Sequence, residues 1–231
     1  MNQYVTTGIV IKRVNYGEAD RIMTFLTPKR GKIRGMAKGV RREKSKLAGG
    51  IELFSESDLT LIKGRGEIDT LISTRLKINY GNIVKDLTRT NAGYDFISIV
   101  DAVTEDNYEE SYYSLLSMAF KFLNVEDLNP ELTKCWFYTK LLDLTGYTPE
   151  LGVDVNDEPL QENESYLFDF SAGRFQPSST EGFSTNVIKL LRLLQKHTPA
   201  QIDKVGGTGD ALVSASQILS RLAEYYLHIK K

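Results

Sequence analysis

The stretch that decides the fold is residues 6–40, TTGIVIKRVNYGEADRIMTFLTPKRGKIRGMAKGV. It holds three short runs rich in Ile, Val, Leu and Thr, separated by turn residues at 15–17 and 28–31. No segment of helical length and period lies between them, so the runs predict β-strands at 6–14, 20–27 and 31–40. The chain therefore begins with an all-β domain.

Two further runs of the same kind follow at 57–64 and 67–78, around the glycine-rich turn at 64–66. Five strands within the first 80 residues predict a small barrel of the OB type, with a five-stranded SH3-like barrel as the structural alternative. We expect an α+β protein, in which this OB-type β-barrel at 1–80 is followed by a mainly α-helical domain at 81–231.

The helical domain is predicted from a change of apolar period, from two to about 3.6, after residue 80. Amphipathic patterns at 83–100, 109–124, 184–197 and 209–231 predict helices. Another is expected after Asn129 as N-cap, with Pro130 at the first helical position and Gly146 as its stop. Between residues 150 and 180, the alternating YLFDF and RFQ around Ser171 to Gly173 predict a small hairpin insert.

Positive charge is concentrated near the start of the chain. Between Lys29 and Lys46, nine of 18 residues are Lys or Arg and only Glu43 is acidic. Residues 1–80 hold 16 Lys and Arg against eight Asp and Glu, whereas the rest of the chain holds 13 against 22. The net charge of −1 thus hides two halves of opposite sign. Such asymmetry favours a polyanionic partner for the first half over a merely solvated surface.

The expected partner is nucleic acid. In an OB barrel, a loop and adjoining strands present a cationic groove, whose Lys and Arg side chains neutralise phosphates and release counterions. Only five of the 23 aromatic residues lie in 1–80, which leaves few rings for base stacking. Binding should therefore be sequence-independent and strongly salt-sensitive. The predicted DNA-binding residues are Arg13, Arg21, Lys29, Arg30, Lys32, Arg34, Lys38, Arg41, Arg42, Lys44, Lys46 and Arg65.

Catalytic and metal chemistry find little support. The chain has no Walker A loop, GxSxG elbow or HExxH helix, and its single Cys135 with two histidines cannot build a Cys- or His-rich metal site. We predict a non-enzymatic protein without cofactor or metal. The glycine-rich VGGTGDALV at 205–213 is interpreted as a turn and helix cap, and Asp154, Asp157 and Glu158 as solvated carboxylates rather than a cation site.

Membrane insertion is not expected, because no apolar run approaches the ~20 residues that a spanning helix needs. The opening residues also lack the basic region and apolar run of a signal peptide. The prediction is a cytoplasmic protein with no membrane contact.

Several ordered motifs resemble the RecO family of bacterial recombination mediators. They are YGEADRI at 16–22, LTPKRGKIRGMAKGVRR at 26–42, KSKLAGG at 44–50 and GRG at 64–66, followed more weakly by LLDLTGYTPEL at 141–151. The resemblance implies a nucleoid-associated protein that binds single- and double-stranded DNA and anneals complementary strands. It also implies contact with the C-terminal tail of single-stranded DNA-binding protein, and partnership with RecR to load RecA.

One departure from the family concerns its zinc finger. Many members carry two CxxC pairs in the insert, and collinear placement puts those four positions near Asp154, Asp157, Gln176 and Ser179. Without cysteines there, thiolate zinc is excluded. We expect the insert to be held instead by packing of its aromatic residues, Tyr166, Phe168, Phe170 and Phe175.

Two other functions stay open at this point. The basic barrel could bind an acidic protein tail, which would make the chain a protein-interaction scaffold. It could also bind RNA, because phosphate contacts alone do not distinguish ribose from deoxyribose.

Overall fold

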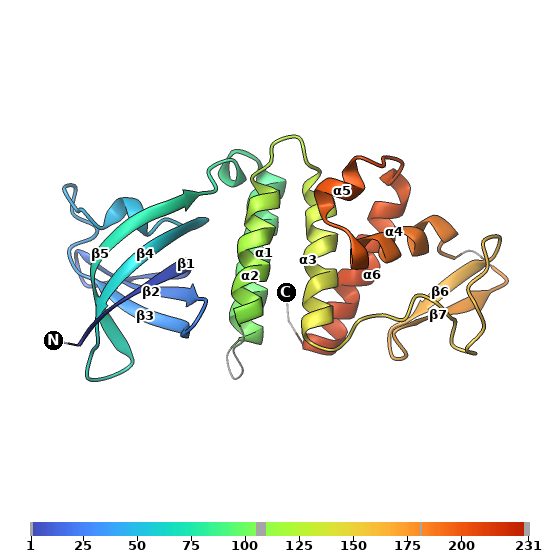
Figure 1. Cartoon of the computed structure of the whole chain (residues 1–231), viewed down its shortest axis with the longest axis horizontal. Helices are drawn as coiled ribbons and strands as arrows, with labels where there is room; N and C mark the ends of the chain where they lie inside the picture. The colour runs from blue at the N-terminus through green and yellow to red at the C-terminus, as the bar shows by residue number, and fades with distance from the viewer. Residues whose placement is uncertain (1, 105–109, 181, 229–231) are drawn as a thin grey trace. The chain divides into compact units, whose positions relative to one another are not determined.

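The computed structural model describes residues 2–104, 110–180 and 182–228, which form two compact units, 1–124 and 125–231 (Figure 1). The first unit contains all five N-terminal strands and two helices, and the second contains the remaining helices and a hairpin. Strands give way to helices after residue 79, but the first two helices belong to the same compact unit as the barrel.

The barrel consists of β1 (Gln3–Tyr16), β2 (Asp20–Thr27), β3 (Gly31–Ala37), β4 (Ser55–Ile62) and β5 (Ile68–Asn79). They pair in the order β1-β2-β3-β5-β4, and β4 pairs back onto β1. All pairs are antiparallel except β3 with β5. The five predicted strands and the OB-type barrel are confirmed.

The strand register decides which side chains face the core. Residues directly opposite each other in antiparallel strands lie on one face of the sheet. Phe25 lies opposite Val10 and Ile33, and it belongs to the buried core of the barrel. One position along β2, Thr24 lies opposite Lys12 and Arg34 on the outer face. The register shift between Val10 and Lys12 places that lysine outside.

Helices α1 (Leu87–Val103) and α2 (Glu110–Leu123) pack against each other and against the barrel. A short 3-10 turn, η2 (Ile83–Lys85), precedes α1, and a second, η1 (Ala48–Gly50), lies between β3 and β4. The buried Phe54 ring lies 5.3 Å from Tyr94 of α1 and 5.4 Å from Phe120 of α2, both edge to face. These aromatic contacts fix the two helices to the barrel.

The second unit begins with α3 (Pro130–Leu144), followed later by α4 (Thr185–Lys196), α5 (Pro199–Asp203) and α6 (Gly209–Leu227). As predicted, the Asn129 side chain caps α3 by accepting a hydrogen bond from the Glu131 amide, and Gly146 follows its end with φ of 80°. The five-residue α5 is not predicted by the apolar pattern. The predicted helical positions 109 and 229–231 lie outside the described residues.

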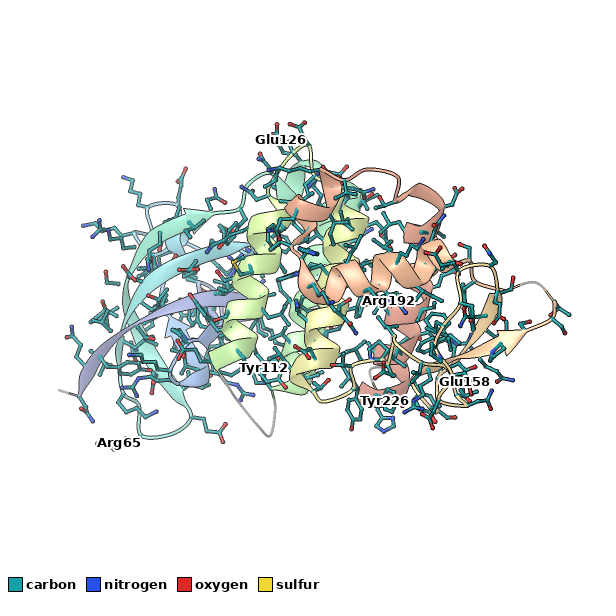
Figure 2. All side chains as sticks on the ribbon, turned by 45° about the vertical axis from the view of Figure 1, so that its right-hand side comes forward. Arg65, Tyr112, Glu126, Glu158, Arg192 and Tyr226 are labelled. Atoms are coloured by element: carbon teal, nitrogen blue, oxygen red, sulfur yellow. The ribbon has the colours of Figure 1, made fainter. Side chains whose placement is uncertain are left out.

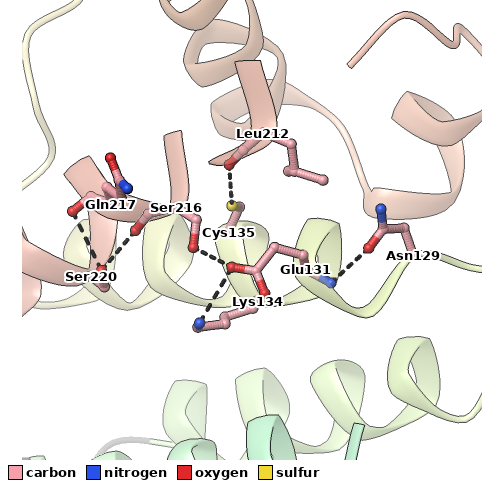
Figure 3. Close-up of polar contacts among 8 residues, drawn as sticks. All are labelled: Asn129, Glu131, Lys134, Cys135, Leu212, Ser216, Gln217 and Ser220. Carbon is pink, nitrogen blue, oxygen red and sulfur yellow. Dashed lines mark hydrogen bonds and ion pairs between the residues drawn. The ribbon is translucent and has the colours of Figure 1, made fainter. Parts of the chain in front are cut away.

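Polar contacts join α3 to α6 around one carboxylate (Figure 3). Glu131 accepts a hydrogen bond from the Ser216 hydroxyl, and its Oε1 lies 3.3 Å from Lys134 Nζ. One turn along, Cys135 is fully buried with its Sγ 4.0 Å from the Leu212 carbonyl oxygen. The single thiol is therefore part of the helical core.

The predicted hairpin insert is present as β6 (Ser165–Asp169) and β7 (Arg174–Ser178). Its four aromatic residues pack as expected: Phe168 lies 5.1 Å from Phe170 and 5.0 Å from Phe175, and Tyr166 lies 6.1 Å from Phe175. Arg192 of α4, labelled in Figure 2, donates two hydrogen bonds to the Leu151 carbonyl at the start of the insert. Packing and hydrogen bonds thus hold the insert.

The four positions at which the resemblance places a zinc finger do not suit that metal in this chain. Asp154 is only 4% exposed, and its Oδ1 accepts hydrogen bonds from the amides of Asn156 and Glu158, so it is not the solvated carboxylate that the sequence predicts. Asp157 pairs with Arg174 at 2.7 Å. Within the part of the chain that the structure describes, no group of three or more His, Cys, Asp or Glu side chains could hold a metal ion.

Across the described ranges, none of the helices combines the length and apolar character needed to cross a lipid bilayer.

Candidate nucleic-acid interface

A cavity of about 840 Å³ opens on the first unit between the barrel and α1. We call it the groove. Five of its side chains are cationic, three are acidic, and the α1 residues Ser98, Asp101 and Ala102 form one wall. Its lining consists of Tyr4, Lys12, Thr24, Arg30, Lys32, Ile33, Arg34, Lys63, Glu67, Asp69, Ser98, Asp101 and Ala102.

The strands place the groove's cations from different parts of the sequence. Lys12, Thr24 and Arg34 form the cross-strand row on the outer face of β1, β2 and β3. Arg30 comes from the turn between β2 and β3, and Lys63 follows β4. Strand pairing thus gathers charges that are up to 51 positions apart.

Each acid in the groove is paired with one of its cations. Lys32 Nζ donates to Asp101 twice, at 2.8 Å to the main-chain oxygen and 3.0 Å to Oδ1. Arg34 lies 3.5 Å from Glu67, and Lys63 lies 3.3 Å from Asp69. The groove therefore carries a small net positive charge, with its cations already held in place.

Asp69 is the buried member of these pairs. Burial by itself would raise the pKa of its carboxyl group, but hydrogen bonds from the Tyr4 hydroxyl, the Gly64 amide and Lys63 outweigh burial and lower it. Arg30 lies over the Tyr4 ring, 4.5 Å from its centroid. The floor of the groove is thus a fixed, ionised network.

A second cationic surface follows β3. We call residues 38–46 the basic loop, which carries Lys38, Arg41, Arg42, Lys44 and Lys46, all exposed, with one acid, Glu43. Its base is fixed beside the β1–β2 turn by two of its backbone amides: the Gly39 amide donates to the Asp20 side chain at Oδ1, at 2.7 Å, and the Arg41 amide donates to the Ala19 main-chain oxygen at 2.9 Å. Gly39 has φ of 65°, which favours glycine.

The charge of the basic loop is not neutralised by neighbouring acids. Among the described residues, no carboxylate lies within the 4.0 Å ion-pair distance of its five cations. Arg41 instead donates through Nη1 to the Gly17 carbonyl oxygen at 3.2 Å. Compared with the groove, the loop exerts the stronger attraction on a polyanion.

The structure distributes the twelve predicted residues over several places. Arg30, Lys32 and Arg34 line the groove, and five others form the basic loop. Arg13 pairs with Glu52 at 2.6 Å, and Arg21 donates to Asn15 at 3.0 Å. Lys29 lies in the β2–β3 turn and Arg65 between β4 and β5, where Figure 2 shows it at the tip of the loop.

The predicted block, continuous in sequence, is divided by β3. This strand has seven residues, so it separates the β2–β3 turn from the basic loop by roughly 20 Å. Lys12 and Lys63 line the groove but are not among the twelve predicted residues. The bulge in β1 hides which way Lys12 points, whereas the position of Lys63 beside the GRG turn was an available signal.

Most aromatic rings of the barrel are buried or covered by other side chains. Phe25, Phe54 and Tyr80 are buried, and Arg30 covers the Tyr4 ring. Tyr16 is 56% exposed at the end of β1. The barrel thus offers a base few free ring faces.

Comparison with known proteins covers almost the whole chain. Residues 1–80 match the family described as "Recombination protein O N terminal", and residues 84–231 match "Recombination protein O C terminal". A protein of Dehalococcoides mccartyi strain 195, named DNA repair protein RecO, is 30% identical over 203 residues, which is 85% of this chain and 79% of that protein.

Two further relatives carry the same name. The protein of Alkaliphilus metalliredigens is 31% identical over 186 residues, covering 80% of this chain and 75% of its own length. The protein of Acetivibrio thermocellus is 36% identical over 150 residues, which is 64% of this chain and 59% of that protein. Together with the OB-type barrel and the two matching family regions, these likenesses show that the chain belongs to the RecO family of DNA repair proteins.

Proposed function

We propose that this RecO-family protein binds single- and double-stranded DNA through backbone phosphates and anneals complementary strands, without catalytic turnover. The observation that carries the proposal is the basic loop, whose five exposed cations have no carboxylate within ion-pair distance among the described residues. Phosphates can approach these cations without first displacing an acid. Counterion release then drives association.

Annealing follows from the same charge. Two single strands repel each other, and the repulsion reaches about 10 Å at ~0.1 M salt. Cations held on a folded barrel lower this repulsion when both strands lie against one surface. Because the barrel offers few free rings, the bases of a bound strand stay available for pairing.

The proposal includes the partners of a recombination mediator. They are RecR, the C-terminal tail of single-stranded DNA-binding protein and, indirectly, RecA. Membership of the RecO family supports these partners, and so does the charge distribution. A cationic barrel can hold DNA while the acidic remainder of the chain, with 13 Lys and Arg against 22 Asp and Glu, stays available to proteins.

The test is fluorescence anisotropy with a mixed-sequence oligonucleotide across a salt series. The variant Lys38→Ala/Arg42→Ala/Lys44→Ala removes three loop cations and leaves Arg41, which holds the loop to Gly17. We expect weaker binding and a salt slope shallower by about 2, since each single-strand phosphate contact contributes about 0.7. Lys121→Ala, on the exposed surface of α2, is the control.

An unchanged affinity and slope in the folded triple variant would remove the basic loop from the site. An acidic peptide that competes with the oligonucleotide would place a protein tail on the same surface, whereas a ternary complex would separate the two. Matched RNA and DNA strands, titrated side by side, test whether the sugar matters.

A further inference from the structure

We infer that the groove is a selector for single strands: it admits one flexible backbone with unpaired bases and excludes a duplex, whereas the basic loop binds both. The inference rests on the proposed DNA binding and assigns a different role to each cationic surface. It adds Lys12 and Lys63 to the residues that face DNA, and it gives Asp101 of α1 a part in selectivity.

The shape of the groove favours a single strand over a duplex. Its volume of about 840 Å³ is that of a pocket for one small ligand, and one side is closed by α1 through Ser98, Asp101 and Ala102. A duplex is stiff over about 150 base pairs and cannot bend into such a pocket. A single strand bends at every nucleotide, so one or two of its phosphates can enter.

The cations inside the groove favour a phosphate that has entered it. Lys12 and Arg34 stand on either side of Thr24, on three neighbouring strands, and Lys32 points from β3 to α1. Cations placed on several sides of one cavity surround a phosphate that has entered it. They offer much less to a phosphate that stays outside.

The acidic residues of the groove compete with a phosphate for its cations. Asp101, Glu67 and Asp69 each occupy a cation that a phosphate would use. A phosphate must compete with these carboxylates, so only a strand that enters the groove and contacts several cations binds there. Of the three pairs, Lys32 with Asp101 joins the barrel to the α1 wall.

The first experiment compares Lys12→Ala/Arg34→Ala with wild type on one oligonucleotide, offered either single-stranded or as a duplex. Both side chains are exposed, so the fold is retained. We expect the Kd for the single strand to rise about fivefold and that for the duplex to stay within about twofold. Lys121→Ala should change neither.

The second experiment uses a variant that should bind the single strand more tightly than wild type does. Asp101→Asn removes the competing charge but keeps the main-chain oxygen that holds Lys32 Nζ at 2.8 Å. We expect the Kd for the single strand to fall about threefold with no change for the duplex. A gain of affinity cannot result from partial unfolding, so this variant separates selectivity from stability.

The results distinguish this inference from the proposed function. Equal losses for both DNA forms in Lys12→Ala/Arg34→Ala, or no loss for either, would overturn the groove as a selector while leaving the basic loop as the DNA site. A wild-type protein that binds neither DNA form would overturn both. Weaker single-strand binding by Asp101→Asn would show that Asp101 supports the strand rather than competing with it.

Discussion

Tyr4 of β1 and Asp69 of β5 lie 65 positions apart in sequence, yet the Tyr4 hydroxyl donates a hydrogen bond to the buried Asp69 carboxylate. Asp69 also accepts from the Gly64 amide at 2.9 Å, which fixes the start of the β4–β5 loop. The pair thus ties the floor of the groove to the loop that carries Arg65. The contribution of this hydrogen bond to the stability of the protein can be measured.

Tyr4→Phe should lower the free energy of unfolding at neutral pH by about 1.5 kcal/mol, because it removes a hydrogen bond to a charged, buried group. The hydrogen bonds hold the pKa of Asp69 below its ordinary value of 3.8 in the folded protein. Their contribution is therefore present above that value and is lost as the pH falls through the lower, folded pKa. Urea unfolding followed by circular dichroism across this range measures it.

The control for this prediction is Tyr16→Phe. Tyr16 is exposed, so removal of its hydroxyl group should leave the free energy of unfolding unchanged. A wild-type to Tyr4→Phe difference that grows as the pH falls below about 3.8 would contradict the assignment of a lowered pKa.

Gly93→Ala should lower the stability of the first unit by about 1–3 kcal/mol. A Cβ at this position of α1 would lie 2.6 Å from the Phe54 ring, which is buried between the barrel and its helices. Thermal unfolding by circular dichroism measures the effect. Gly49→Ala is the matched control, because a Cβ there has no atom within 4 Å; equal effects of the two would show that the Phe54 contact is loose.

Cys135 should resist alkylation in the folded protein. Burial, together with the nearby charge of Glu131, raises the pKa of its thiol to about 12, so the reactive thiolate is scarce at neutral pH. Mass spectrometry after iodoacetamide treatment should find labelling only when denaturant is added. Rapid labelling without denaturant would mean that α3 and α6 separate readily around the thiol.

Chelators should leave the second unit unchanged. The zinc positions expected from the family resemblance fall near Asp154, Asp157, Gln176 and Ser179, none of which is a cysteine, and the aromatic cluster packs the hairpin instead. Thermal unfolding with and without EDTA should coincide. A drop in melting temperature on chelation would show a bound metal that these residues do not explain.

The aromatic cluster of the insert should itself contribute to the stability of the second unit. Phe175→Ala should destabilise the unit by about 3–5 kcal/mol, because the ring is fully buried and contacts both Tyr166 and Phe168. Leu167→Ala, on the exposed side of β6, should change stability little. Fluorescence of Trp136, which lies in α3 of the same unit, can follow both.

The elements of the fold were predictable where the chain repeats a simple pattern. Alternating β-branched residues predicted the strands, and Asn129, Pro130 and Gly146 marked the two ends of α3. The pattern did not reveal α5, because five residues are too few to establish a period.

The basic loop was predictable from composition, but the groove was not. Its walls depend on which strands become neighbours and on where α1 lies, and neither follows from residues near Lys32 in sequence. The pairing of Lys32 with Asp101 spans 69 positions. Asp154 differs from its prediction for a similar reason: its hydrogen bonds with two backbone amides depend on the path of the loop, which composition does not describe.

The alternation along β3 also limits how this region can change in evolution. Ile33, Gly35 and Ala37 face the barrel core, and Lys32 and Arg34 face outward on the same seven-residue strand. Insertion or deletion of a single residue would exchange the two faces, burying the cations and exposing the core. Charges on β3 can therefore change by substitution, whereas the length of the strand is fixed by the barrel core and the cationic outer face together.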